Sequence, residues 1–172
     1  MRLAVNYSPQ AAQLLDAGTI QFDLYKCPDW PDMIETARTQ RPVYVHFPLM
    51  AGRGNVETVG WQKITDLLAD TITPFVNTHL APRASDFGIA LEADDPARGR
   101  ELENAMRLDI DRLAQHFGRA RIILENANWD PGYDIPQLVL DPALISRIRA
   151  DSGAGFLLDL AHARMAAVHL GF

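Results

Sequence analysis

Hydrophobic and polar positions along the chain follow two alternating patterns. Short runs of aliphatic and aromatic residues are typical of strands that are buried on both faces. Between these runs, apolar residues recur every three or four positions, as they do along one face of a helix. The runs predict six strands, at about residues 3–7, 20–25, 43–47, 74–79, 121–125 and 155–160.

Helices are predicted in the segments between these strands. Ser8 followed by Pro9 is a typical helix start, because serine caps the helix and proline suits the first helical position. The longest helix is expected at about residues 97–117, where Gly118 ends it. Further helices are expected at about residues 31–37, 58–69, 142–150 and 161–170.

The strict alternation of strands and helices indicates an α/β protein with a parallel sheet. The repeated unit favours a TIM-barrel-like (β/α) fold with six of the eight units present. A closed barrel typically needs about 250 residues, and the chain has 172. We expect a single domain over residues 1–172 that lacks the C-terminal two strand–helix units, either as a truncated barrel or as a fragment of a longer enzyme. The alternative is an open six-stranded sheet whose edges a partner covers.

Composition and charge narrow the class of protein. The formal net charge is −6, which disfavours a nucleic-acid surface because phosphate binding usually needs a basic face. Cys27 is the only cysteine, so no internal disulfide can form, and a reducing, cytoplasmic location is expected. The N-terminus does not look like a signal peptide, and no stretch approaches the roughly 20 apolar residues that span a bilayer.

Four predicted strands end in side chains that can bind metal ions. These candidate ligands are His46 after PVYV, His79 after FVNT, Glu125 after RIIL, and Asp159 with His162 after GFLL. Successive strands of a barrel are neighbours and deliver such side chains to its carboxyl edge. Imidazole and carboxylate ligands together suit iron, manganese or zinc, and the absence of thiolates disfavours a structural zinc site.

Each candidate ligand also has a purely structural interpretation. A single histidine at a strand end, such as His46, is more often packed or hydrogen-bonded than bound to a metal. Glu125 and Asp159 follow aliphatic residues, where a buried acid is costly unless it is paired, hydrogen-bonded or metal-bound. Because histidine or acidic residues recur at the ends of four predicted strands, a shared metal site is favoured over four unrelated structural roles.

Other residues are candidates for catalysis and substrate binding. Lys26 follows the second predicted strand, and we assign it a catalytic role together with Glu125. Asn126 and Asn128 come directly after Glu125 and are expected to line the substrate pocket.

Two arginines have open interpretations. Arg164 lies close to His162 along the chain, and Arg83 follows HLAP. Each either holds an anionic group of a substrate or is simply solvated. The segment AGRGN contains two glycines but lacks the lysine and the helix context of a phosphate-binding P-loop.

At these residues the chain resembles the xylose isomerase-like TIM-barrel superfamily, which includes endonuclease IV, sugar isomerases and epimerases, and multinuclear non-haem iron oxidases. The order His, His, Glu, Asp-x-x-His is similar to the first half of the metal constellation in endonuclease IV. The segments THLAP, ILENANW and GFLLDLAHAR look closest to the iron-oxidase branch and its uncharacterised relatives. In such families further ligands come from strands seven and eight, which this chain does not reach, and the basic DNA-contacting loops of endonuclease IV are not evident.

The resemblance implies a metal-dependent enzyme once the barrel is complete. The favoured activity is that of an iron-dependent oxidase acting on a small molecule or peptide, with manganese or zinc as alternative metals. A sugar or sugar-phosphate isomerase or epimerase with a divalent metal is the second interpretation. A third, from another class, is a non-catalytic binding or scaffold protein that pairs as a homodimer through open sheet edges.

Overall fold

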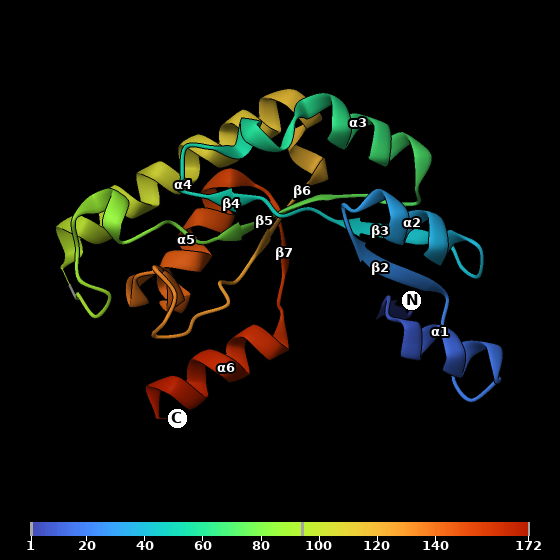
Figure 1. Ribbon diagram of the computed structural model, residues 1–172. Coiled ribbons are helices and arrows are strands. Elements are labelled where there is room, and N and C mark those ends of the chain that lie inside the picture. The colour runs from blue at the N-terminus through green and yellow to red at the C-terminus, as the bar shows by residue number, and fades with distance from the viewer. Residues whose placement is uncertain (1, 94, 172) are drawn as a thin grey trace. The chain divides into compact units, whose positions relative to one another are not determined.

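The computed structural model describes residues 2–93 and 95–171 and has an α/β architecture (Figure 1). The chain divides into two compact units. The first comprises Met1–Pro48 and Val59–Val76, and the second comprises Leu49–Thr58 and Asn77–Phe172. Helices alternate with strands, and adjacent strands pair in parallel, as detailed below for each unit. The predicted α/β class with parallel strand pairing is therefore confirmed.

The first unit contains a parallel three-stranded sheet with strands in chain order. Its strands are β1 (Ala4–Asn6), β2 (Leu24–Pro28) and β3 (Val43–His46), and its helices are α1 (Pro9–Asp16), α2 (Pro31–Arg38) and α3 (Trp61–Asp70). Helix α1 begins as predicted, because the Ser8 hydroxyl accepts a hydrogen bond from the N–H of Ala11. Helix α2 packs against β2 and β3.

Strand β2 begins later than the hydrophobic pattern predicts. The expected strand at residues 20–25 is confirmed only for Leu24 and Tyr25, because residues 20–23 are irregular and the Asp23 carboxylate accepts the N–H of Leu3. Lys26 therefore lies inside β2, opposite Asn6 of β1 and Tyr44 of β3, and does not follow the strand.

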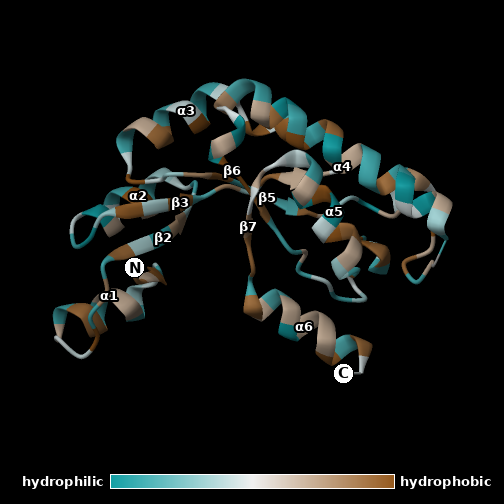
Figure 2. Ribbon diagram, turned by 180° about the vertical axis from the view of Figure 1, so that it is seen from behind, coloured by the Kyte–Doolittle hydropathy of each residue, from teal (hydrophilic) through white to brown (hydrophobic). Residues whose placement is uncertain are grey.

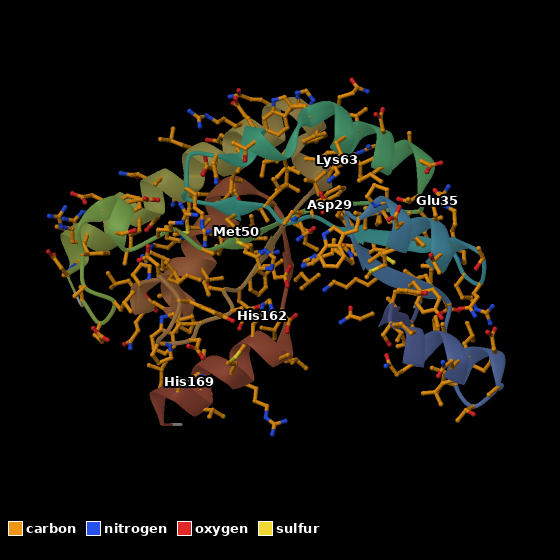
Figure 3. The ribbon with its side chains drawn as sticks, in the orientation of Figure 1. Asp29, Glu35, Met50, Lys63, His162 and His169 are labelled. Carbon is orange, nitrogen blue, oxygen red and sulfur yellow. The ribbon has the colours of Figure 1, made fainter. Side chains whose placement is uncertain are left out.

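A buried ion pair connects α3 to the segment after β2. The Asp29 carboxylate is almost fully buried, and the Lys63 ammonium group donates to it. Figure 3 labels both residues, which point toward one another. A buried carboxylate needs such a counter-charge, so this pair fixes α3 within the first unit.

We expect Cys27 to be unreactive in the folded protein. Its side chain is fully buried in β2, and burial raises the pKa of the thiol from 9.0 to about 11. The thiolate fraction at pH 8 then falls roughly 100-fold, and the thiolate is the reacting species. An aromatic disulfide reagent should label Cys27 quickly only in denaturant. Equal labelling rates for folded and denatured protein would show that the thiol is accessible.

The second unit contains a four-stranded sheet, again with strands in chain order. Its strands are β4 (Met50–Ala51), β5 (Val76–Leu80), β6 (Ile122–Glu125) and β7 (Gly155–Leu157), and its helices are α4 (Pro96–Phe117), α5 (Pro142–Ser152) and α6 (Leu160–Leu170). Strands β4 and β5 pair in parallel, as do β6 and β7. Helix α4 packs against β4, β6 and α5. Figure 2 shows hydrophobic and hydrophilic residues alternating along α4, as expected for a helix with one buried face.

Strand β4 lies where the sequence patterns predict no strand. Met50 pairs with His79, so the segment begins as a strand. Gly52 then adopts a φ of +94°, and a Cβ there would lie 2.8 Å from the Cβ of Pro82. The buried Asp109 carboxylate of α4 accepts the N–H groups of Gly52 and Gly54 at 2.8 and 2.9 Å, which fixes the loop on α4.

Strand β7 ends earlier than predicted. The expected strand at residues 155–160 is wrong beyond Leu157, because the Asp159 carboxylate accepts the N–H groups of Ala161 and His162 and caps α6. Leu158 is 58% exposed, so this apolar run is not a strand buried on both faces. Strand β5, in contrast, is buried along its whole length, as predicted.

In the part of the chain that the structure describes, no helix combines the length and the apolar character needed to cross a bilayer. The single domain over residues 1–172, the homodimer through open edges and the cytoplasmic location stay predictions.

Candidate metal centre

Two imidazoles and two carboxylates meet in the second unit, where β5, β6 and β7 end. Nε2 of His79 lies 3.5 Å from Oε2 of Glu125, and Nδ1 of His162 lies 3.7 Å from Oε1 of Glu125. Nε2 of His162 lies 3.6 Å from Oδ2 of Asp159. The predicted ligands His79, Glu125, Asp159 and His162 are thus neighbours, and Figure 3 places His162 on the first turn of α6, next to β7.

The local sequence explains why these side chains reach one place. His79 is the fourth residue of the buried strand β5, and Glu125 is the last residue of β6. Asp159 and His162 follow β7 at the start of α6, where a residue and its neighbour three positions later share a helix face. The carboxyl ends of three consecutive strands in the sheet order therefore supply all four groups.

Each imidazole is oriented by a backbone carbonyl. Nδ1 of His79 lies 3.2 Å from the carbonyl oxygen of Leu49, and Nδ1 of His162 lies 3.0 Å from that of Asn126. With the proton assigned to Nδ1, each ring donates to its carbonyl and presents a lone pair on Nε2. Histidine ligands of metals usually donate their second N–H in this way, which fixes the tautomer and the ring orientation.

Asp159 has two roles that use different oxygens. Its Oδ1 accepts the N–H groups of Ala161 and His162 and caps α6. Its Oδ2 faces Nε2 of His162. The structural interpretation of Asp159 is therefore correct for one oxygen, while the second oxygen stays directed toward the cluster.

Asn126 holds the ends of β6 and β7 together. Its side-chain amide donates to the carbonyl oxygen of Asp159 at 3.0 Å, and its side-chain oxygen accepts the N–H of Asp159 at 2.8 Å. The backbone carbonyl of the same residue contacts His162. These contacts make Asn126 a positioning residue for two of the candidate ligands, and its predicted contact with substrate stays a prediction.

Three of these groups, those of Glu125, Asp159 and His162, fit a divalent metal ion. Glu125 has no solvent exposure, and a carboxylate taken out of water requires positive charge nearby. Ligand atoms of Glu125, Asp159 and His162 lie within 4.8 Å of one another, which is a spacing that one ion can bridge. Nitrogen and oxygen donors without sulfur suit iron, manganese or zinc.

A pocket of about 430 Å³ opens beside this cluster. His79 and His162 line it, together with Asn128, whose predicted contact with substrate stays a prediction. Oδ1 of Asn128 is buried, and no hydrogen-bond partner for it is found among the described residues. The other lining residues are Met50, Arg53, Ala81, Arg83, Gly132, Tyr133, Asp134 and Ile135. The pocket thus brings the candidate ligands into contact with space that a small molecule can occupy.

Side-chain contacts fix two walls of the pocket. Ser85, after β5, donates from its hydroxyl and its N–H to the Asp134 carboxylate, after β6. These hydrogen bonds from Ser85, and more weakly the charge of Arg83, lower the pKa of Asp134 below its ordinary value, although partial desolvation opposes them. Trp129 is buried and donates from Nε1 to the carbonyl of Ile135 at 2.7 Å. The loops after β5 and β6 are therefore tied to each other and to the core.

The other predicted site residues are His46, Lys26 and Arg164. His46 ends β3 and Lys26 lies within β2, so both belong to the first unit. Arg164 is exposed on α6 and does not line the pocket. The roles predicted for these three residues stay predictions.

Sequence reasoning missed Arg53, which lines the pocket from the loop after β4. Its signal was the pair of flanking glycines, both of which have positive φ. Such glycines indicate a tightly turned backbone. From the sequence, this segment was compared only with a phosphate-binding P-loop, and no role was assigned to Arg53.

Comparison with known proteins gives no independent support for a family. No protein-family model matches the chain, and a search of curated proteins finds no match.

Proposed function

We propose that the protein is a metal-dependent enzyme of the xylose isomerase-like TIM-barrel superfamily, acting as an iron-dependent oxidase on a small molecule or peptide. One observation carries this proposal: two histidines with carbonyl-anchored Nδ1 atoms meet a fully buried glutamate beside a pocket. A structural ion pair alone would not require both imidazoles to be oriented in this way.

The donor set supports iron as the favoured metal. Two histidines and one carboxylate are the protein ligands of many non-haem iron sites, which leave positions open for substrate and oxygen. His79, His162 and Glu125 would hold the ion, with Oδ2 of Asp159 as a further ligand. When bound, the metal would polarise a substrate or activate oxygen. His46, the fifth predicted ligand, stays a prediction.

The chain's own residues would prepare the site for this chemistry. Asn126 fixes the backbone of Asp159 and thereby the first turn of α6. Leu49 and Asn126 set the tautomers of the two histidines through their carbonyls. The side chain of Asn128 lines the pocket and offers an amide for orienting a bound substrate.

A TIM-barrel-like fold is part of the proposal. Within each unit the strands follow chain order, with helices between most of them. Chain-order pairing of parallel strands is what a (β/α) barrel requires. Location of the candidate ligands at carboxyl strand ends supports the same architecture, because barrel enzymes place their chemistry at that edge.

The proposal is tested by metal content and oxygen uptake. Protein purified without oxygen or chelator should contain stoichiometric iron, and His79→Ala should lose it, whereas His116→Ala, at the end of α4, should retain it. Oxygen consumption by the iron-loaded protein with candidate substrates supports the oxidase. Oxygen-independent conversion of a ketose or hydroxy-carbonyl compound would replace the oxidase by an isomerase. A folded protein without metal would favour a binding or scaffold protein.

A further inference from the structure

Two arginines lie at the pocket in an arrangement that the metal centre does not explain. Arg53, from the loop after β4, and Arg83, from the loop after β5, both line the pocket that also contains His79 and His162. Among the described residues neither arginine forms an ion pair, whereas most other arginines of the second unit do.

Arg53 is held in place by contacts that leave its outer nitrogens available. Its Nε donates to the carbonyl oxygen of Ala81 at 2.7 Å, and Asp109 fixes the glycines on both sides of it. No hydrogen bond of its two terminal nitrogens is found among the described residues. A guanidinium group anchored through Nε can present both terminal nitrogens side by side to one ligand.

The electrostatic surroundings of Arg53 are unfavourable without a bound anion. Partial burial lowers the pKa of Arg53, and the like charge of Arg83 lowers it further, while Asp86 and Asp134 offset part of this effect. The Asp134 carboxylate is itself engaged by Ser85. Two like charges in one pocket repel each other, and an anion between them would remove that cost.

We propose that Arg53 and Arg83 form an anion subsite that binds a carboxylate or phosphate group of the substrate, while the rest of the substrate extends toward His79 and His162. Guanidinium groups bind such anions through paired, charge-assisted hydrogen bonds. Substrates are therefore small molecules or peptides that carry an acidic group. Anion binding by the two arginines does not depend on the proposed function. The inference rests on the proposed function only where it calls the bound molecule a substrate.

Binding of inorganic phosphate and of succinate, measured by calorimetry on the protein as purified, tests the subsite. Arg53→Gln and Arg83→Gln should each weaken binding of the preferred anion about tenfold or more, the loss expected for one charge-assisted contact. Arg121→Gln, at the opposite end of β6 from Glu125, is the matched control and should bind like wild type. Preference for phosphate or for succinate would decide which acidic group the substrate carries.

A second variant separates this inference from the metal proposal. Glu125→Gln should lose the metal but keep its anion affinity, because the two arginines are unchanged. Anion binding without metal binding would refute the proposed function alone. The subsite is refuted if the wild type binds neither anion, or if both arginine variants bind like wild type. Arg83 is exposed, so Arg83→Gln should fold normally even if Arg53→Gln does not.

Discussion

Replacing Glu125 by glutamine is expected to weaken metal binding at least about 100-fold. Loss of a partner that only orients a ligand already costs about 10- to 100-fold, and Glu125 is placed to be a ligand itself. Glutamine keeps the size of the side chain but removes its charge. His79 and His162 would then retain their carbonyl contacts without the central carboxylate.

Metal titration of the purified variant measures this effect directly. Glu103→Gln is a suitable control, because Glu103 is also a largely buried glutamate of the second unit but pairs with Arg107 and Arg147 on another face. The control should bind metal like wild type. Equal affinity of Glu125→Gln and wild type would mean that the glutamate is a structural acid and not a ligand.

The second large effect is expected at Asp109, which lies on α4 and is not a candidate ligand. Asp109→Ala should reduce the free energy of unfolding by about 3 kcal/mol or more. The buried carboxylate accepts two N–H groups through one oxygen, Oδ2, and hydrogen bonds to charged groups contribute about 1.5–3 kcal/mol each. Alanine would leave the N–H groups of Gly52 and Gly54 without this acceptor, and that of Gly52 is buried.

Asp109→Asn is the matched variant for this position. An amide oxygen in place of Oδ2 can accept both N–H groups, so the expected loss is only about 1 kcal/mol. Urea unfolding curves for the two variants give the comparison. Because Arg53 lies between the two glycines, Asp109→Ala should also weaken phosphate or succinate binding. If the alanine variant is as stable as the asparagine variant, the carboxylate does not anchor this loop.

Patterns confined to neighbouring residues were sufficient to predict most elements. The apolar run at β5 and the periodic apolar positions of α4 depend only on residues close together in the sequence. The bounds of both elements were therefore predicted to within a few residues. Strand β4 was missed because two residues carry no recognisable period. The end of β7 was misplaced because FLLDLA is apolar enough for a strand, whereas the capping contacts of Asp159 start a helix within it.

In the candidate site, too, features set by neighbouring residues could be predicted, and contacts between distant residues could not. Glu125, Asp159 and the two histidines could be predicted because each stands at the end of an apolar run. The anchoring of Nδ1 by backbone carbonyls could not, because Leu49 lies 30 residues from His79 and Asn126 lies 36 from His162. Arg53 escaped notice because its place in the pocket depends on contacts with α4 and with the loop after β5.

The most direct test of the metal centre is anomalous X-ray diffraction from crystals of the iron-loaded protein. The account predicts one or more iron peaks at bonding distance, about 2.0–2.2 Å, from Nε2 of His79, Nε2 of His162 and a carboxylate oxygen of Glu125. An iron peak bound by other residues, or no peak in folded protein grown with excess iron, would contradict it.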